Sequence, residues 1–384
     1  MNDGSIISPR AEIDKIDDEI LRLLNKRAEV ALTVGKAKSD VESPLCDSGR
    51  ERDVLARLAL KNPGPLDSQS VENIFQRIID ESLLLQQNTY RSRRETSEAG
   101  VPTRIAGTQR VAILGERGTF SEEAALGILG EECETVPCPT FEILFSAIKD
   151  GRADVILTPL ENSLIGSVHR CVDLLLASEL KIVAEASLPV SHYLVGCHAA
   201  TLDTIRSVES HPAALGQCTR FFAAHPDLKR IEADDTAGSV RRAVESGDPT
   251  RAAIGSHRAG EIYGGKILRE HIEDHSENFT RFALLSADSN QHAAGSKISL
   301  VLRLRHEPGS LHDALRPFVR RGIDLLKIES LPIRDSPGEF NFYLDIQAPA
   351  IEADLDGAMA DVREQASEVR FLGRYSVTKL DATA

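Results

Sequence analysis

Two polar stretches divide this 384-residue chain into parts with different hydrophobic patterns. Each stretch is interrupted by glycine or lacks a sustained period of hydrophobic residues. The first stretch covers residues 91–109 and the second covers residues 287–296. A chain of this length is also too long for one ordinary hydrophobic core. We therefore expect a first domain over residues 1–90, a second over 110–286 and a third over 297–384, joined by two linkers.

Composition and charge argue against several classes of protein. The formal net charge of −14 disfavours a broad nucleic-acid-binding surface. No segment approaches the roughly 20 apolar residues of a membrane span, and the N-terminus lacks the apolar core of a signal peptide. The six cysteines form no CxxC pair and no zinc-like spacing with histidine. We expect a cytoplasmic protein with reduced thiols, no metal, and no membrane or nucleic-acid partner.

The first part has the pattern of an all-helical domain. Apolar residues recur near a 3.6-residue period over residues 13–34, and Ser8–Pro9 has the residue types of a helix start. The pattern continues to about Lys38. A helix of about 30 residues cannot bury its apolar stripe in so small a monomer, which indicates intertwining with a second subunit. Two shorter helices are expected to begin near Ser48 and Asp67.

Charged side chains lie on otherwise apolar helix faces. Arg27 and Lys38 are 11 positions apart, about three turns, and share one face. Arg10 lies 17 positions before Arg27 and points to a different side. It would serve the same pocket only from another subunit. One interpretation is that these side chains extend to solvent and that Glu51 merely favours a helix N-terminus. The whole set instead indicates an anionic ligand, because unpaired buried charge is very costly.

Three strings in this part resemble the all-helical chorismate mutase family: VGKAK (34–38), RERD (50–53) and ESLLLQQ (81–87). The resemblance implies rearrangement of chorismate to prephenate without a cofactor. It implies that arginines hold two carboxylates, that Lys38 and Gln86 donate to the ether oxygen, and that Glu51 binds the ring hydroxyl. The implied substrate-binding residues, with the first lent by the partner subunit, are Arg10, Arg27, Lys38, Asp47, Arg50, Glu51, Ser82 and Gln86.

The second part alternates short apolar runs with helical patterns, which favours an α/β fold with a mostly parallel sheet. Strands are predicted at residues 111–115, 154–160, 181–186 and 193–197, and helices at 121–129, 141–149 and 212–223. Polar clusters follow the strands, where α/β proteins bind their ligands. The motifs that carry these clusters are GERGTFSEEAA from Gly115, PLENSLIGSV from Pro159, ESHPAALGQC from Glu209, DDTAGSV from Asp234 and NFTRF from Asn278.

Together these motifs resemble prephenate dehydratase, which has two α/β lobes similar to type II periplasmic binding proteins. The resemblance implies that prephenate loses its carboxylate and ring hydroxyl to give phenylpyruvate. Thr280 is identified with the family's essential threonine, and we interpret it as a hydrogen-bond donor to the departing hydroxyl. The implied substrate-binding residues are Thr119, Ser121, Asn162, Ser163, Ser210, Gln217, Thr280 and Arg281.

Three points in this part stay open. Arg281 either holds a substrate carboxylate or pairs with the acidic run before it. His211 is either a general acid or a structural residue before Pro212. Glu116 stands where the family commonly has proline, which affects a turn more than the chemistry.

The third part has the strand–helix–strand–strand–helix–strand order of a ferredoxin-like fold. HEPGSLHDAL (306–315) and KIESLPIR (327–334) resemble the ligand motifs of the ACT domain, an amino-acid-sensing module. The resemblance implies phenylalanine as an effector between two such domains, at Gly309, Ser310, Leu311, Glu329 and Ser330. Ser310 and His312 depart from the family's Ala and Val, and Leu331 replaces its Arg, so feedback strength and effector identity stay open.

The order of the three parts resembles bifunctional chorismate mutase/prephenate dehydratase enzymes with a regulatory domain, acting on the route to phenylalanine. We expect a homodimer or higher homo-oligomer. Two alternatives stay open. In the first, the dehydratase part acts on arogenate instead of prephenate. In the second, the chain is a binding or regulatory protein with a degenerate catalytic site.

Overall fold

The computed structural model describes residues 4–41, 43–91, 110–288, 295–333 and 339–381. The chain forms two compact units. One consists of residues 1–98 and 299–371, and the other of residues 99–298 and 372–384. Most of the two predicted linkers lies outside the described residues.

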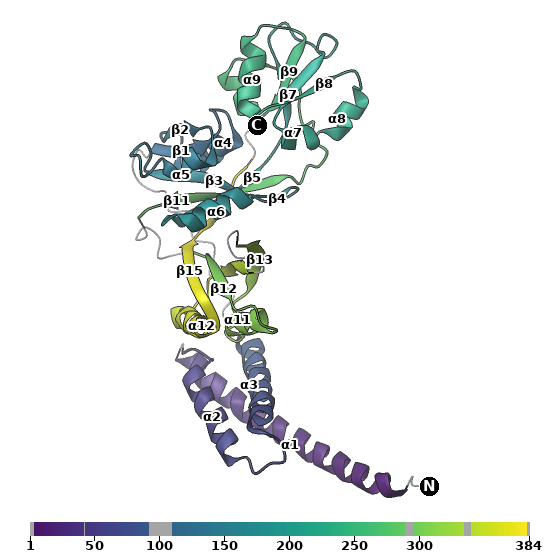
Figure 1. The fold of residues 1–384 in the computed structure, drawn as a ribbon, viewed down its shortest axis with the longest axis vertical. Coiled ribbons are helices and arrows are strands. Elements are labelled where there is room, and N and C mark those ends of the chain that lie inside the picture. Colours follow the sequence, from purple (N-terminus) through teal and green to yellow (C-terminus); the bar gives the residue numbers. More distant parts are fainter. Residues whose placement is uncertain (1–3, 42, 92–109, 289–294, 334–338, 382–384) are drawn as a thin grey trace. The chain divides into compact units, whose positions relative to one another are not determined.

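The N-terminal part consists of the three predicted helices, α1 (Gly4–Asp40), α2 (Ser48–Lys61) and α3 (Ser68–Arg91) (Figure 1). The expected start of the first helix is wrong, because α1 begins at Gly4 and contains Pro9. Pro9 is the sixth residue of α1, beyond the first turn, where it costs the helix one backbone hydrogen bond. Helix α2 begins where expected, since the Asp47 carboxylate accepts a hydrogen bond from the Arg50 N–H at 2.9 Å.

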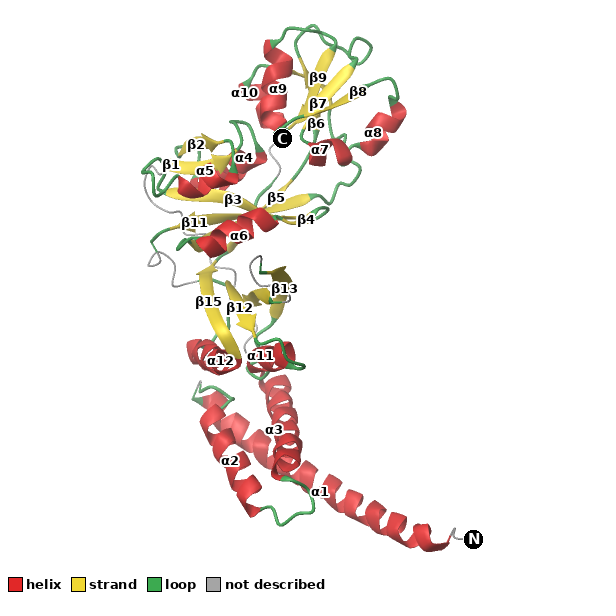
Figure 2. Ribbon diagram, in the orientation of Figure 1, coloured by secondary structure: helices red, strands yellow, loops and turns green. Residues whose placement is uncertain are grey.

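The C-terminal part has the predicted βαββαβ order. Its elements are β12 (Lys297–Leu304), α11 (Ser310–Val319), β13 (Leu325–Pro332), β14 (Phe340–Gln347), α12 (Glu352–Gln365) and β15 (Ala366–Tyr375). The four strands are ordered β13-β14-β12-β15, and α11 packs beside α12. Both helices lie at the same side of the sheet (Figure 2). Phe318 of α11 and Val362 of α12 are buried there.

The middle part forms two α/β lobes, as predicted. The first lobe has a sheet ordered β16-β5-β11-β3-β1-β2, with β4 beside β3. Its elements are β1 (Arg110–Leu114), α4 (Phe120–Leu129), β2 (Glu134–Cys138), α5 (Phe141–Ser146), β3 (Val155–Asn162), β4 (Gly166–Ser167), α6 (His169–Ala177), β5 (Lys181–Pro189), β11 (Phe279–Ser286) and β16 (Val377–Lys379).

The second lobe is inserted between β5 and β11 and has a sheet ordered β10-β6-β9-β7-β8. Its elements are β6 (Tyr193–Gly196), β7 (Ser207–Ser210), α7 (Pro212–Gly216), α8 (Thr219–Ala224), β8 (Lys229–Glu232), α9 (Thr236–Glu245), β9 (Arg251–Gly255), α10 (His257–Ile262) and β10 (Lys266–Arg269). The chain thus passes into the second lobe once and returns from it once.

The expectation of mostly parallel sheets is wrong, because both sheets are mixed. Strand β1 runs parallel to β2 and β3, but β11 runs antiparallel to β3 and β5. In the second lobe β7 is parallel to its neighbours, whereas β6 is antiparallel to β9 and β10. The unbroken apolar runs report burial on both faces of each strand, and burial does not fix strand direction.

Three predicted boundaries also change. Helix α5 ends at Ser146, and the helix expected over residues 212–223 is broken into α7 and α8. Between them the Gln217 carbonyl accepts a hydrogen bond from the Asp274 N–H at 2.7 Å. Residues 377–379 were expected in the third domain, yet β16 pairs with β5 at the edge of the first lobe's sheet.

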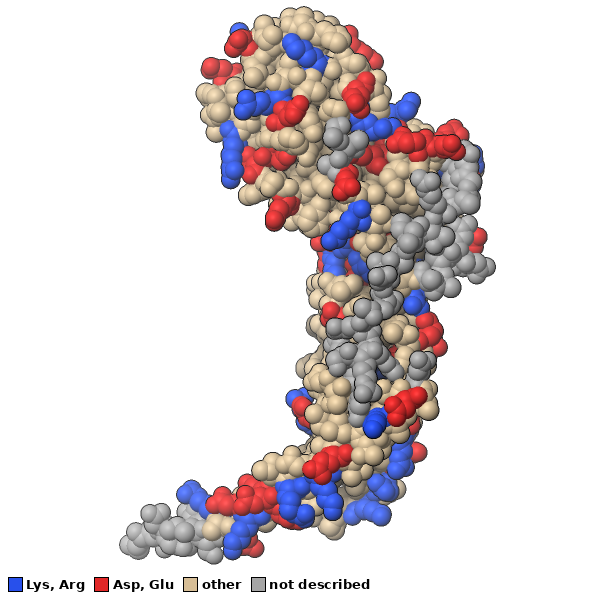
Figure 3. Space-filling model, turned by 180° about the vertical axis from the view of Figure 1, so that it is seen from behind, with Lys and Arg blue, Asp and Glu red and all other residues tan. Residues whose placement is uncertain are grey.

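On the face seen in Figure 3, basic and acidic side chains are interspersed within each part. Among the described helices, none combines the length and apolar content that a bilayer crossing requires.

Candidate active sites

Helices α1 and α3 bring three predicted mutase residues together. Arg27 Nη1 donates to Ser82 Oγ at 2.5 Å and to the Ile78 carbonyl at 3.3 Å. One turn further along α3, the buried Gln86 donates from Nε2 to the Ala31 carbonyl at 2.6 Å. Burial lowers the pKa of Arg27, although an arginine side chain is not deprotonated in proteins. The seam between α1 and α3 therefore holds a cation and two neutral hydrogen-bonding groups.

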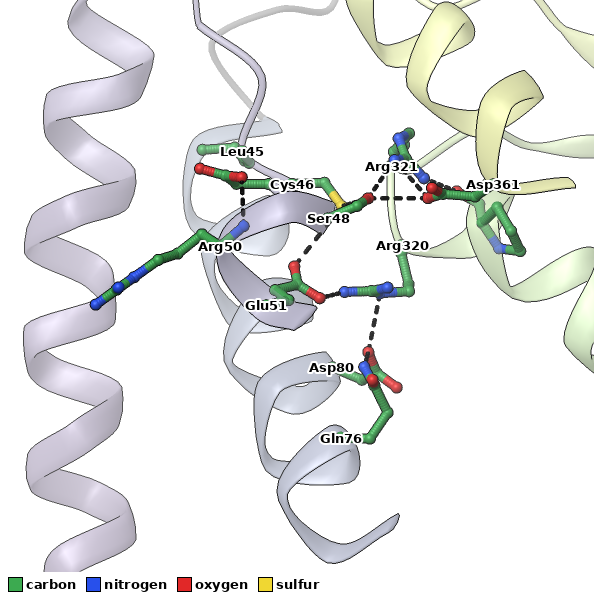
Figure 4. Close-up of polar contacts among 12 residues, drawn as sticks. Leu45, Cys46, Ser48, Arg50, Glu51, Gln76, Asp80, Arg320, Arg321 and Asp361 are labelled. Atoms are coloured by element: carbon green, nitrogen blue, oxygen red, sulfur yellow. Dashed lines mark hydrogen bonds and ion pairs between the residues drawn. The ribbon is translucent and has the colours of Figure 1, made fainter. Parts of the chain in front are cut away.

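The loop between α1 and α2 positions the next group. Lys38 Nζ donates to the Leu45 carbonyl at 2.9 Å, which ties the end of α1 to the residues before α2. Asp47 caps α2, so its carboxylate orients the helix start. Arg50 is exposed and points away from the contacts around Arg320 in Figure 4.

Glu51 occupies the same first turn of α2, but its carboxylate is already paired. Its partner is Arg320, the residue that ends α11 in the C-terminal part, and both side chains are largely buried (Figure 4). The sequence indicated no link between these two residues, which lie far apart along the chain.

Arg10 is not brought to the other mutase residues. It is exposed on α1, 17 residues before Arg27 on the same helix. At 1.5 Å per residue, the two are about 25 Å apart along the helix axis. A single chain therefore cannot place both arginines on one small substrate.

In the middle part, Thr280 lies in a chain of side-chain hydrogen bonds. Asn162 Nδ2 donates to Thr280 Oγ1 at 3.0 Å and to Asn278 Oδ1 at 2.9 Å. Asn278 Nδ2 donates to Gln217 Oε1 at 3.0 Å. Gln217 Nε2 lies 3.5 Å from Asn162 Oδ1, which closes a ring of amides beside Thr280. Because Thr280 Oγ1 accepts from Asn162, its own proton can be given to a ligand.

The sequence analysis did not identify two members of this hydrogen-bonded cluster, Asn278 and His192. Asn278 begins the NFTRF motif and is 1% exposed. His192 Nε2 lies 2.7 Å from Gln217 Oε1, an arrangement in which the histidine donates from Nε2. Burial lowers the pKa of His192, which favours the neutral ring. A single histidine after a strand carries no sequence signal that distinguishes a site residue from a structural residue.

The second ring nitrogen of His192 is a buried acceptor. Within the described part of the chain, Nδ1 has no hydrogen-bond partner. The Phe120 ring meets the His192 ring edge-on, with centroids 5.9 Å apart. This contact brings the N-terminus of α4, with Thr119 and the buried Ser121, against the same cluster.

Arg281 follows Thr280 and pairs with carboxylates from the two neighbouring strands. Its guanidinium donates to Glu185 of β5 through two bonds of 2.9 Å and to Glu161 of β3 at 2.6 Å. Lys297 Nζ also reaches Glu185 Oε2 at 2.9 Å. This network fixes β11 between β3 and β5. A role for Arg281 in holding the strands therefore stands beside the predicted role on the substrate.

Other predicted dehydratase residues have structural contacts. Ser163 Oγ accepts from the Phe279 N–H at 3.0 Å and so ties β11 to the turn after β3. Ser210 is fully buried and donates to the Ile254 carbonyl at 2.7 Å, within the second lobe. His211 caps α7 by accepting from the Ala213 N–H at 3.2 Å, which matches its structural interpretation.

The predicted effector residues lie on two elements of the C-terminal part. Gly309 has a φ of +92° and precedes α11, whose first residues are Ser310 and Leu311. Glu329 and Ser330 lie on β13, one of the two edge strands of this sheet. Leu331 is 5% exposed, so this residue packs into the core.

The sequence matches two known families. Residues 9–87 match chorismate mutase type II, and residues 111–290 match prephenate dehydratase. The bifunctional chorismate mutase/prephenate dehydratase of Neisseria gonorrhoeae is 32% identical over 379 residues, which cover 98% of this chain and 99% of that protein. The chain belongs to this bifunctional family.

Two solved structures share the fold of the later parts of the chain. Prephenate dehydratase of Arthrobacter aurescens, in complex with L-Phe, covers 70% of this chain and 90% of its own, with 29% identity and a TM-score of 0.64. A chain titled GqqA, a novel type of quorum quenching acylases, covers 70% and 98%, with 29% identity and a TM-score of 0.62. As a member of the bifunctional family, the chain combines a chorismate mutase domain and a prephenate dehydratase domain in one enzyme.

Proposed function

We propose that the helical part rearranges chorismate through electrostatic positioning by its own side chains. Arg27 and Arg50, with Arg10 of a second subunit, would hold the two carboxylates and favour the compact reactive conformer. Lys38 and Gln86 would donate to the ether oxygen, which gains negative charge in the transition state. Support comes from the Arg27–Ser82 bond and the burial of Gln86 in the same seam. Gln86 is neutral at all accessible pH values, so it can donate continuously.

We infer that the middle part converts prephenate to phenylpyruvate, carbon dioxide and water at the cluster around Thr280. Breaking the C–O bond places negative charge on the departing hydroxyl, which needs a donated proton or a strong hydrogen bond. Thr280, held by Asn162, would supply that hydrogen bond. Loss of the carboxylate supplies the electron pair that completes the aromatic ring.

The observation that carries this assignment is the closed ring of Asn162, Asn278 and Gln217 beside Thr280. The experiment follows chorismate loss and phenylpyruvate formation with the purified chain. Both activities together support the full assignment. Mutase activity without phenylpyruvate would contradict the dehydratase part, and arogenate would then be the substrate to test.

We also infer that the functional molecule contains at least two copies of the chain. The apolar stripe of α1 is half exposed in a single chain, with Ile13, Ile16 and Ile20 between 48% and 55% exposed. The distance of Arg10 from Arg27 independently calls for a second copy, since only another α1 would bring an equivalent arginine to the seam. One partner helix would satisfy both requirements.

For the C-terminal part we propose an ACT-type regulatory domain with phenylalanine as effector. The βαββαβ order, the turn at Gly309 and the edge position of β13 support this assignment. The Arthrobacter aurescens dehydratase, whose solved complex contains L-Phe, supports the choice of amino acid. Phenylalanine added to the activity assay should lower phenylpyruvate formation, whereas an unchanged rate would remove this part of the proposal.

Two further assignments concern the second substrate and the cellular compartment. Prephenate and arogenate differ at one side-chain centre, and the family relationship favours prephenate; turnover of the two substrates side by side separates them. We also propose a reducing compartment such as the cytoplasm, supported by six free thiols, of which Cys171 has its pKa raised to about 12 by burial.

A further inference from the structure

Helix α11 connects the two regions of this unit that carry predicted ligand sites. Its N-terminus follows Gly309, at the predicted effector motif, and Arg320, the residue directly after its last turn, contacts the helical part. Several polar contacts join the two regions. The Arg320 carbonyl accepts from Gln87 Nε2 at 2.5 Å, and Arg321 Nη2 donates to Ser48 Oγ at 2.8 Å. The end of α11 is thus held to both α2 and α3.

The Arg320 side chain bridges two carboxylates of the helical part (Figure 4). Its Nε lies 3.0 Å from Asp80 Oδ1 on α3, and its Nη2 pairs with Glu51 Oε2 on α2. The three side chains are between 12% and 16% exposed. An ion pair in such a setting is held more firmly than one at the surface, because water and salt screen it less.

Glu51 keeps an acceptor oxygen beyond this ion pair. A carboxylate has two oxygens and about four lone-pair sites. Arg320 engages Oε2, while the one polar contact of the other oxygen among the described residues is a long hydrogen bond of 3.8 Å donated by Cys46 Sγ. Oε1 therefore keeps acceptor capacity for a substrate hydroxyl while the guanidinium fixes the orientation of the carboxylate.

We propose that Arg320 is a positioning residue of the mutase site, acting through Glu51. The proposal rests on the proposed role of Glu51 as acceptor of the ring hydroxyl. Through Arg320 the C-terminal domain would influence the mutase reaction directly, in addition to any effect on the dehydratase reaction. A group that orients a ligand-binding side chain changes the reaction without touching the substrate.

The position of α11 also allows the contact between Arg320 and Glu51 to change when α11 moves. A cavity of about 180 Å³ lies beside the ion pair between α2, α3, α11 and α12. Arg320 itself lines this cavity, so its side chain borders open space on that side. Because α11 is a single ten-residue helix, a ligand that shifts its first turn at Ser310 also displaces Arg320.

Other charged groups lie on every element that lines the cavity or contacts Arg320. They are Asp80, Asp313, Arg316, Arg321 and Asp361, together with Arg52 and Glu364, which form an exposed pair with each other that solvent screens. Arg320 is the cation in direct contact with the Glu51 carboxylate, so its removal leaves several carboxylates near Glu51. The pKa of Glu51 should then rise, because burial and like charge both disfavour the ionised form.

The test compares full-length variants in the mutase assay over a pH series. Arg320→Gln should lower mutase kcat/KM by about tenfold, the size expected when a charged group loses one well-placed contact. It should also move the acid limb of the mutase profile to higher pH. Arg320→Lys keeps the charge and should recover part of both changes. The matched control is Arg52→Ala, which removes the exposed Arg52–Glu364 pair across the same contact region and should change neither.

A double variant shows whether the effect passes through Glu51. If it does, Arg320→Gln adds little to the loss already caused by Glu51→Gln, whereas independent effects would multiply. The proposal is overturned if the wild type has mutase activity and Arg320→Gln changes neither its rate nor its acid limb, or if Arg52→Ala changes both equally. Absence of mutase activity in the wild type would instead contradict the proposed function.

Discussion

Thr280 is the residue on which the dehydratase assignment depends most directly. Replacing Thr280 by Ala removes the hydroxyl that Asn162 orients, and we expect phenylpyruvate formation to fall by at least about 100-fold. Thr280→Ser keeps a hydroxyl and should retain more activity than the alanine variant. Mutase activity, measured on the same samples, should stay at the wild-type level. Loss of both activities, with altered circular dichroism, would mean that the variant is misfolded.

His192 allows a second prediction at the same scale, because it is buried and kept neutral. Burial lowers its pKa below the usual 6.5, so the unfolded chain binds the proton more readily than the folded one. Its contribution to stability is fully present above about pH 6.5 and falls as the pH drops toward the folded-state pKa.

His192→Gln removes this titration while keeping a donor in reach of Gln217. The loss of stability of the dehydratase domain between about pH 7.5 and pH 5.5 should therefore be smaller in the variant than in the wild type. Urea unfolding at the two pH values measures this difference. An equal loss in both proteins would show that His192 does not control the acid sensitivity.

At the scale of elements, the turn between β1 and α4 depends on Gly118. Its φ is +84°, and a Cβ there would lie 2.7 Å from the backbone Cα of Ala259 in the second lobe. We expect Gly118→Ala to destabilise the dehydratase domain by about 1–3 kcal/mol or to force the lobes apart.

Gly151→Ala is a matched control, since Gly151 also has positive φ, at +67°, but a Cβ would meet nothing within 4 Å. Its cost should be limited to backbone strain. Denaturant midpoints and dehydratase rates of the two variants distinguish the effects. Equal costs would show that the close approach to Ala259 relaxes without penalty.

The elements themselves were largely predictable, because amphipathic and apolar runs report burial. The three N-terminal helices, the βαββαβ order and the strands before Gly115 and Asn162 follow from local patterns. The direction of β11 and the break between α7 and α8 do not, since both depend on distant partners. Gln217 reaches Asn162 across 55 residues, and Asn162 reaches Thr280 across 118. Local sequence patterns do not predict contacts between residues so far apart. For the same reason the contact of His192 with Gln217 could not be predicted.

At the scale of the whole molecule, the proposed mutase site draws residues from two chains. Arg10→Ala and Arg27→Ala should each abolish mutase activity and leave phenylpyruvate formation from added prephenate unchanged. If Arg10 serves the partner's site, a mixed dimer of the two variants contains one site with both arginines and one site with neither.

Co-expression of the two variants should therefore restore mutase activity to about one quarter of the wild-type level, because about half of random dimers are mixed and each mixed dimer has one intact site. The mutase activities of the two variants, expressed and purified separately, provide the baseline. Dehydratase activity normalises the amount of folded enzyme. Failure to recover activity in proven mixed dimers would show that Arg10 does not complete the partner's site. An Arg10 acting within its own chain would require α1 to fold back over about 25 Å, which a continuous helix of this length does not permit. Complementation is therefore the outcome expected from the single-chain geometry.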